Sequence, residues 1–333
     1  MIDIRNFVNI NFERDKTSTE NGSRPIVMLY SGASNQVTEK LIVGANSDCT
    51  KFYDDKGVEA TIEAPIKKYV TIFFKNGGAK LQIKNGDMPK TADDFKKLPI
   101  ENIVFAMVGL NSTTALKTYA PILAKLKGVY QKVLLCRDDT ATLNTASTAD
   151  GSDFIACKVS AIEGAEMSIA AYLSKIKAYQ VGSPVDYDFT EEFGIEEDLS
   201  NTINYGKEDT SLAEIPFNFE MHIANKYLNI GGNTISGKDL VEQFVIIVME
   251  QTTSESVFNT LSAKISGQAG VASIRTALAS ELDKFTSSGF LATDQVWTKP
   301  DLILPNALDD TKPSETVITK NTPLGTGYHI HMF

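Results

Sequence analysis

The chain has 333 residues, more than a single hydrophobic core usually supports, so we expect two or three compact lobes. Its 42% hydrophobic and 22% charged residues exclude a disordered or fibrous chain. A formal net charge of -10, without a basic stripe studded with aromatic residues, disfavours nucleic acid as a partner.

The apolar runs are too short to cross a membrane. The longest, Phe244–Met249 and Ile103–Leu110, fall far below the roughly 20 residues that a transmembrane helix needs. Residues 1–6 have neither a basic start nor an apolar core, so we expect no secretory signal and no membrane span. The three cysteines are odd in number and predict buried thiols instead of a disulfide framework.

Residues 1–24 are predicted to form an N-terminal arm. Val8, Ile10 and Phe12 alternate with polar residues, which is the period-two pattern of a half-buried strand. A polar loop over residues 17–23 separates this strand from the rest of the chain.

Residues 25–190 are predicted to form an α/β lobe. The apolar run Ile26–Tyr30 is typical of a strand buried on both faces, and this strand belongs either to the lobe or to the C-terminal sheet. Tyr69–Phe74 predicts another strand, and the Asn-Gly-Gly tract behind it predicts a hairpin turn into Lys80–Lys84.

Two strand–helix units follow in the same lobe. Ile103–Val108, a helix over residues 113–126 and Lys132–Cys136 have the spacing of a βαβ unit with parallel strands. Phe154–Val159 predicts the next strand, and a helix follows it. The apolar face of that helix contains Ile162, Ala165, Ile169, Leu173 and Ile176.

Residues 185–214 are predicted to be an acidic connector. They contain ten acidic residues and one lysine, and therefore carry most of the net charge. Asp186-Tyr187-Asp188 resembles the metal-holding pair of sugar transferases, but in this acidic context we favour a solvated connector.

Residues 215–324 are predicted to form a C-terminal α+β domain. It opens with a strand-like segment, Ile215–Leu228, and continues with three helices. The first covers about residues 238–250, the second begins at Thr252 with the spacing of a capping box, and the third covers about residues 270–288.

Residues 325–333 are predicted to form a C-terminal strand arm. Tyr328, Ile330 and Met332 alternate with His329 and His331. A terminal strand needs a sheet edge, because its backbone groups are otherwise unpaired. The two histidines could share a metal, but we favour ordinary positions on the polar face.

Two further motifs are weak indications of chemistry. Gly232–Asp239 has the glycine and lysine spacing of a phosphate-binding loop, but Asp239 replaces the hydroxyl residue that would contact magnesium. Asp138 and Asp139 follow a strand of the α/β lobe without a nucleophile or histidine nearby. We therefore predict no enzyme, no cofactor and no metal site.

The order of these parts resembles that of contractile phage tail sheath proteins, which share their fold with tail-like bacteriocins and type VI secretion sheaths. The similar features include the turn at Phe73–Gly78 and a helix containing Ala170–Ser174. They also include Asn225–Tyr227 before the glycine-rich turn at Gly231–Gly237. The implied fold is a sheath-type C-terminal α+β domain with an inserted α/β lobe and two strand arms.

The resemblance implies a structural subunit that forms stacked six-fold rings around a tail tube and contracts to drive the tube through a cell envelope. The implied partners are further copies of the chain and the tail tube, baseplate and tail terminator proteins. The implied location is the virion tail, after assembly in the host cytoplasm.

In such sheaths, arms of adjacent subunits add strands to the sheet of the C-terminal domain. The helix over residues 270–288 is the candidate tube-facing helix, with Arg275 and Lys284 as polar contacts. Two other interpretations stay open: another tail or capsid structural protein, such as a tube or baseplate component, and an α/β enzyme or ligand-binding protein. The arm residues in this chain are Val8, Ile10, Phe12, Tyr328, Ile330 and Met332.

Overall fold

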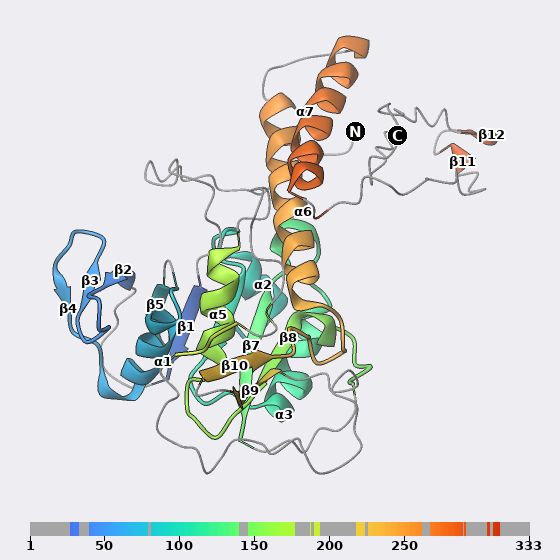
Figure 1. Cartoon of the computed structure of the whole chain (residues 1–333). Helices are drawn as coiled ribbons and strands as arrows, with labels where there is room; N and C mark the ends of the chain where they lie inside the picture. Colours follow the sequence, from blue (N-terminus) through green and yellow to red (C-terminus); the bar gives the residue numbers. More distant parts are fainter. Residues whose placement is uncertain are drawn as a thin grey trace.

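A ten-stranded sheet forms the centre of the computed structural model (Figure 1). From one edge to the other, its strands are β10 (Lys226–Ile230), β9 (Asn218–Ile223), β8 (Ile155–Val159), β7 (Val133–Asp138), β6 (Val104–Met107), β1 (Val27–Ser31), β5 (Leu81–Asn85), β2 (Lys40–Ala45), β3 (Phe52–Asp54) and β4 (Glu59–Ala60). The strands from β9 to β5 are parallel, and β10 and β2 flank them as antiparallel neighbours. The structure describes residues 27–32, 40–78, 81–139, 146–176, 187, 190–193, 218–223, 226–261, 267–288, 290, 305–306 and 309–313.

The central parallel strands β1, β6, β7 and β8 are buried on both faces over most of their length, as their apolar sequences predict. In β1, residues 27–30 are each at most 2% exposed. β1 lies between β5 and β6, so the first strand belongs to the centre of the α/β sheet. The parallel pairing of β6 with β7 confirms the predicted βαβ unit.

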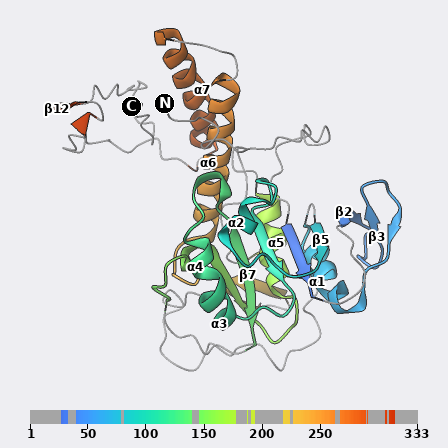
Figure 2. The same ribbon diagram turned by 180° about the vertical axis from the view of Figure 1, so that it is seen from behind.

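Helices cover both faces of the sheet. One face carries α1 (Ala64–Lys75), α5 (Glu166–Lys175) and the first half of α6 (Leu240–Leu261), as Figure 1 shows. The opposite face, seen in Figure 2, carries α2 (Ala92–Lys96), α3 (Ser112–Thr114), a π-helical turn η2 (Ala115–Tyr119) and α4 (Ala120–Leu123). Short 3₁₀ turns η3 (Gly128–Tyr130) and η4 (Ser152–Phe154) precede β7 and β8. The predicted mixed α/β class is confirmed.

The segment predicted as a strand, Tyr69–Phe74, lies within α1 instead. Pro65 in the first turn suits a helix start, because its missing N–H has no helical partner there. β5 follows as a strand parallel to β1, so the predicted hairpin with Lys80–Lys84 is wrong. Four of the six buried residues of α1 recur at helical spacing on one face: Ile66, Tyr69, Val70 and Phe73.

The Asn-Gly-Gly tract ends this helix with a Schellman motif. Gly77 has a φ of 76°, and its N–H donates to the carbonyl of Phe74 at 2.9 Å. The N–H of Gly78 donates to the carbonyl of Phe73, also at 2.9 Å. A Cβ on Gly78 would lie 2.3 Å from the buried Phe73 ring, so packing requires the second glycine. The tract is therefore a helix stop.

One continuous helix, α6, replaces the first two helices predicted for the C-terminal domain. The expected break at Thr252 is wrong, because this hydroxyl donates to the carbonyls of Val248 and Met249 at 3.1 and 3.2 Å within the helix. The helix is capped instead at Asp239, whose carboxylate accepts the N–H of Glu242 at 2.7 Å.

The third predicted helix is confirmed as α7 (Gly267–Ser287), which forms a hairpin with α6. The first half of α6 is buried in the body, where Leu240 and Phe244 are at most 1% exposed. The second half stands clear of the sheet together with α7 (Figure 1). Phe285, near the end of α7, is 0% exposed and connects the hairpin to the core.

The sheet continues across the predicted boundary between residues 25–190 and residues 215–324, because β9 pairs with β8. Among the described residues, β11 (Pro305–Asn306) and β12 (Asp309–Pro313) form a separate two-stranded sheet. The boundaries predicted from the sequence for the two arms, the α/β lobe, the acidic connector and the C-terminal domain stay predictions. The predicted arm residues Val8, Ile10, Phe12, Tyr328, Ile330 and Met332 lie outside the described residues.

Gly151 and Gly128 provide a matched test of close packing, since both have positive φ, of 87° and 58°. A Cβ on Gly151 would lie 2.1 Å from the carbonyl oxygen of Ala120, whereas a Cβ on Gly128 would meet open space. We expect Gly128→Ala to cost about 1 to 2 kcal/mol of unfolding free energy through backbone strain. Gly151→Ala should cost about 1 to 3 kcal/mol more, because overpacking adds to the strain. Urea unfolding measures both, and equal losses would contradict the close approach.

Candidate functional site

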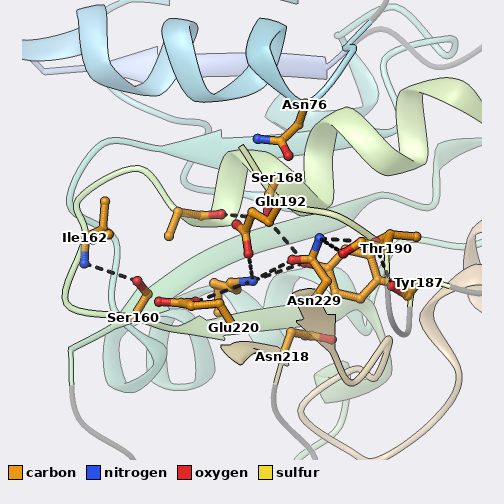
Figure 3. Close-up of polar contacts among 12 residues, drawn as sticks. Asn76, Ser160, Ile162, Ser168, Tyr187, Thr190, Glu192, Asn218, Glu220 and Asn229 are labelled. Atoms are coloured by element: carbon orange, nitrogen blue, oxygen red, sulfur yellow. Dashed lines mark hydrogen bonds and ion pairs between the residues drawn. The ribbon is translucent and has the colours of Figure 1, made fainter. Parts of the chain in front are cut away.

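Lys158, the fourth residue of β8, is the centre of a buried polar cluster. Figure 3 labels its partners Glu192, Glu220 and Asn229. Side chains alternate along β8, so Cys157 and Val159 face the α4 layer and Lys158 faces α5. The Lys158 Nζ atom lies 2.7 Å from Oε2 of Glu192 and 3.5 Å from Oε2 of Glu220. Burial opposes the charge, but these carboxylates, Glu192 foremost, outweigh it and raise the pKa of Lys158 above its ordinary value.

Three uncharged side chains complete the cluster. Asn229, on β10, accepts hydrogen bonds from Lys158 Nζ at 2.7 Å and from the hydroxyl of Tyr187. The Tyr187 oxygen also lies 3.3 Å from Lys158 Nζ and 3.2 Å from the Ser168 hydroxyl of α5. Burial raises the pKa of Tyr187, so the phenol stays protonated and can donate.

The cluster contains one ammonium group and two carboxyl groups. Burial raises the pKa of Glu192 even though the Lys158 ammonium lies beside it. Oε1 of Glu192 and Oε2 of Glu220 are buried without a hydrogen-bond partner among the described residues. A buried ion pair adds little net stability, but removing one partner leaves a costly unpaired charge. The cluster therefore selects one arrangement of the elements that supply it.

Glu192 comes from residues 190–193, the docked segment, which lies along the edge of the sheet and is joined to β10 by an isolated bridge. The Glu192 N–H donates to the carbonyl of Tyr227 at 2.8 Å, and the Asn229 N–H donates to the carbonyl of Thr190 at 2.8 Å. These bonds form an antiparallel bridge. Residues 190–192 therefore close the edge of β10.

Asn76, at the end of α1, fixes the next residue of this segment. Its Nδ2 donates to the carbonyl of Phe193 at 2.8 Å, and its Oδ1 accepts the Phe193 N–H at 3.0 Å. The Asn76 carbonyl accepts a hydrogen bond from Lys175 Nζ of α5 at 2.9 Å, which also places a cation at the α1 C-terminus. Asn76 thus links two helices to the docked segment.

The prediction of a solvated connector over residues 185–214 is wrong at Tyr187 and Glu192, which are 1% and 2% exposed. One signal in the sequence could have indicated this site. Lys158 interrupts the apolar run Phe154–Val159, and a buried lysine requires acceptors. The acceptors could not be identified, because Glu192 lies 34 residues further along the chain.

The two residues predicted to face a tube, Arg275 and Lys284, both lie on α7. Lys284 is 48% exposed and pairs with Glu281, one turn earlier, at 2.6 Å. Arg275 is partly buried, and its Nε has no hydrogen-bond partner among the described residues. Near Lys284 a polar groove of about 500 Å³ separates α6 from α7. The role of either cation in binding stays a prediction.

Two buried side chains form hydrogen bonds where the α6–α7 hairpin leaves the body. Gln251 of α6 donates to the carbonyls of Ile100 and Val129 at 2.7 and 3.0 Å. Lys132 is 0% exposed and donates to the carbonyls of Ile100 and Pro99 at 3.2 and 3.3 Å. Burial lowers the pKa of Lys132 to about 7.

The loop Gly232–Asp239 connects β10 to α6, and its polar groups bond within the protein. The N–H groups of Gly232 and Asn233 donate to Oδ1 of Asn218 at 2.7 and 2.9 Å. Lys238, in the position of a phosphate-binding lysine, instead pairs with Asp153 at 2.6 Å. These bonds use the donors that a phosphate would need, so the loop serves as a structural connection.

Asp138 and Asp139 lie at the carboxyl end of β7, beside a hollow of about 190 Å³. Arg137, Glu166 and Asn111 also line this hollow. Within the described part of the chain, no three side chains form a group that could hold a metal ion. Other metal candidates from the sequence lie outside the described side chains: Asp186, Asp188, His222, His329 and His331.

Comparison with known proteins identifies a fold similarity. No family model and no curated protein matches the sequence. Among solved structures, the chain is similar to the helical sheath of the anti-feeding prophage in its contracted state, determined by cryo-EM. The TM-score is 0.54 at 13% sequence identity, over 94% of this chain and 89% of that chain. The chain therefore has a sheath-like fold. None of the helices in the described ranges combines the length and apolarity needed to span a bilayer.

We expect Lys158→Met to lower the free energy of unfolding by about 3 to 5 kcal/mol, because Glu192 and Glu220 would lose their buried counter-charge. The matched control is Lys226→Met, which removes a lysine that pairs with Glu191 at 2.9 Å but is 58% exposed. That change should cost less than about 1 kcal/mol. Urea denaturation compares the two, and similar losses would show that the buried cluster is not specially sensitive.

Lys132 predicts a pH dependence of stability. The unfolded chain keeps this proton up to about pH 10, whereas the folded chain releases it at about pH 7. The unfolded state therefore binds more protons within this window, so this residue makes the unfolding free energy increase with pH. Lys132→Met should remove that increase, whereas Lys117→Met, at an exposed position, should retain it. Urea titrations across the window would contradict the assignment if wild type and Lys132→Met changed in parallel.

Proposed function

We propose that the chain is the structural subunit of a contractile tail sheath, which forms stacked six-fold rings around a tail tube and contracts to drive the tube through a cell envelope. The observation that carries the proposal is the fold similarity to a contracted sheath over 94% of the chain. The proposed partners are further copies of the chain, the tube, and the baseplate and terminator proteins of a virion tail assembled in the host cytoplasm. In this role the protein acts through contacts and not as an enzyme.

The terminal arms are the proposed links between subunits. A strand added from another copy needs an open sheet edge. Residues 190–192 already occupy the edge of β10, whereas β11 and β12 form a two-stranded sheet within the described residues. A two-stranded sheet is marginally stable alone and gains from added strands. We therefore assign β11 and β12 as the acceptor for the arms. The arm residues are Val8, Ile10, Phe12, Tyr328, Ile330 and Met332.

The α6–α7 hairpin is the proposed tube-facing element. The second half of α6 stands clear of the sheet together with α7 (Figure 1). Arg275 and Lys284 both lie on α7. Cations at such a position would steer association with an acidic tube more than they would add affinity. Because the hairpin is rooted in the core through Gln251 and Phe285, a force on the hairpin would be transmitted to the sheet.

Electron microscopy of the purified full chain tests the proposal. Wild type should form hollow helical cylinders. Ile330→Asp should abolish long cylinders, because a charge on the apolar face of the terminal strand opposes its burial. The matched control is His331→Asp, which places the same charge on the opposite face of the predicted strand and should retain them.

Deletion of residues 328–333 should have the same effect as Ile330→Asp. Urea unfolding of each variant should match wild type, which shows that the body still folds. A wild-type chain that stays monomeric under all assembly conditions would overturn the proposed function. Normal cylinders from Ile330→Asp and from the deletion would overturn the role of the C-terminal arm alone.

A further inference from the structure

The hollow beside Asp138 is a polar site of the body to which the proposed function assigns no role. It lies at the carboxyl ends of β6 and β7, where the loop after β6 approaches the first turn of α5. In open α/β sheets this end of the strands is the usual place for ligands. Asp139 and Asn111 at its rim are exposed, so the hollow can be reached from solvent.

Glu166, the first residue of α5, lines this hollow with a polar group that lacks a partner. The residue is 1% exposed, and its Oε2 is buried without a hydrogen-bond partner among the described residues. Burial raises the pKa of Glu166 to about 7. An unpartnered buried carboxyl group is costly, and a donor in the hollow would remove that cost.

The nearby guanidinium group of Arg137 does not donate a hydrogen bond to Oε2 of Glu166. Arg137 uses Nη1 to bond the carbonyl of Ser160 at 2.6 Å. Oδ2 of Asp138 accepts the N–H of Ser112 at 3.3 Å, while no partner of Asp139 is found among the described residues. Three carboxyl groups thus face one guanidinium group, and the hollow favours a cationic ligand.

An organic cation fits better than a metal ion. Although three carboxyl groups line the hollow, no three side chains within the described residues form a group that could hold a metal ion. Its volume of about 190 Å³ suits the end of one side chain and not a large ligand. Of the 32 basic residues of the chain only five are arginines, so a lysine is the more numerous source of such a cation.

We propose that this hollow receives the ammonium group of a lysine from a second copy of the chain. The inference rests on the proposed function, since it requires that copies of the chain assemble. The topology offers two candidate lysines, Lys125 and Lys127, in the turn after α4. They are exposed and form no ion pair with any residue in the described ranges.

These lysines lie at the opposite end of the body from the hollow. α4 belongs to the crossover from the carboxyl end of β6 to the amino end of β7, so the turn that follows it is near the amino end. A contact between opposite ends of identical subunits is heterologous, and it generates rings or helical filaments instead of closed dimers. This geometry agrees with the proposed assembly.

Charge reversal in the full chain tests the contact. Asp139→Lys should raise the concentration needed for polymerisation by at least about tenfold, because two like charges would meet. Lys125→Asp combined with Lys127→Asp should have the same effect, and joining these changes to Asp139→Lys should restore assembly. The matched control is Asp150→Lys, an exposed acidic position outside the hollow, which should assemble like wild type.

Glu166→Gln tests the buried group, and it should weaken assembly while urea unfolding shows a folded body. Carbodiimide treatment of wild-type polymers, followed by mass spectrometry, should join Asp138 or Asp139 to Lys125 or Lys127 of another copy. If wild type polymerises and the variants do so equally well, or if the cross-links join these carboxyl groups only to lysines of the same copy, the inference is wrong and the proposed function stands. A wild-type chain that never polymerises would overturn both.

Discussion

Much of this structure depends on how the ammonium group of Lys158 is satisfied inside the sheet. A lysine in the middle of a strand buried on both faces would be costly without acceptors. The acceptors come from separate parts of the chain: Glu220 from β9, Asn229 from β10 and Glu192 from the docked segment. The charge therefore selects one arrangement of these elements on the parallel core, although its net contribution to stability is small.

The same contacts connect the docked segment to the helical layer. Glu192 lies on the sheet side of the segment, and Phe193 is bound by Asn76 at the end of α1. Lys175 of α5 completes this connection through the Asn76 carbonyl. Sheet, segment and two helices thus form one tightly packed unit. Displacement of one part of this unit would move the other parts with it, because a close-packed interior transmits displacement with little deformation.

Elements with a local signal could be predicted from the sequence, and elements that depend on distant partners could not. β6, β7, β8 and α5 follow from apolar runs and helical spacing. The aromatic and β-branched residues of Tyr69–Phe74 suit a strand as well as a helix, and the Asn-Gly-Gly tract can end a helix as well as turn a hairpin. The periodicity from Ile66 onward decides for a helix. The pairing of Glu192 with Lys158 joins residues far apart in sequence, so only the folded arrangement reveals it.

The docked segment also covers an open edge of the sheet. An open edge strand is a template for unspecific pairing, which is a particular hazard for a protein present in many copies. At one end of the ten-stranded sheet, residues 190–192 bond to β10, and Asn76 takes the backbone groups of Phe193 beyond them. At the other end the last strand, β4, is two residues long, which also limits pairing. With both edges shielded in this way, the sheet offers little template for pairing with another chain. In the proposed assembly, contacts between copies would therefore depend on other segments and on side chains.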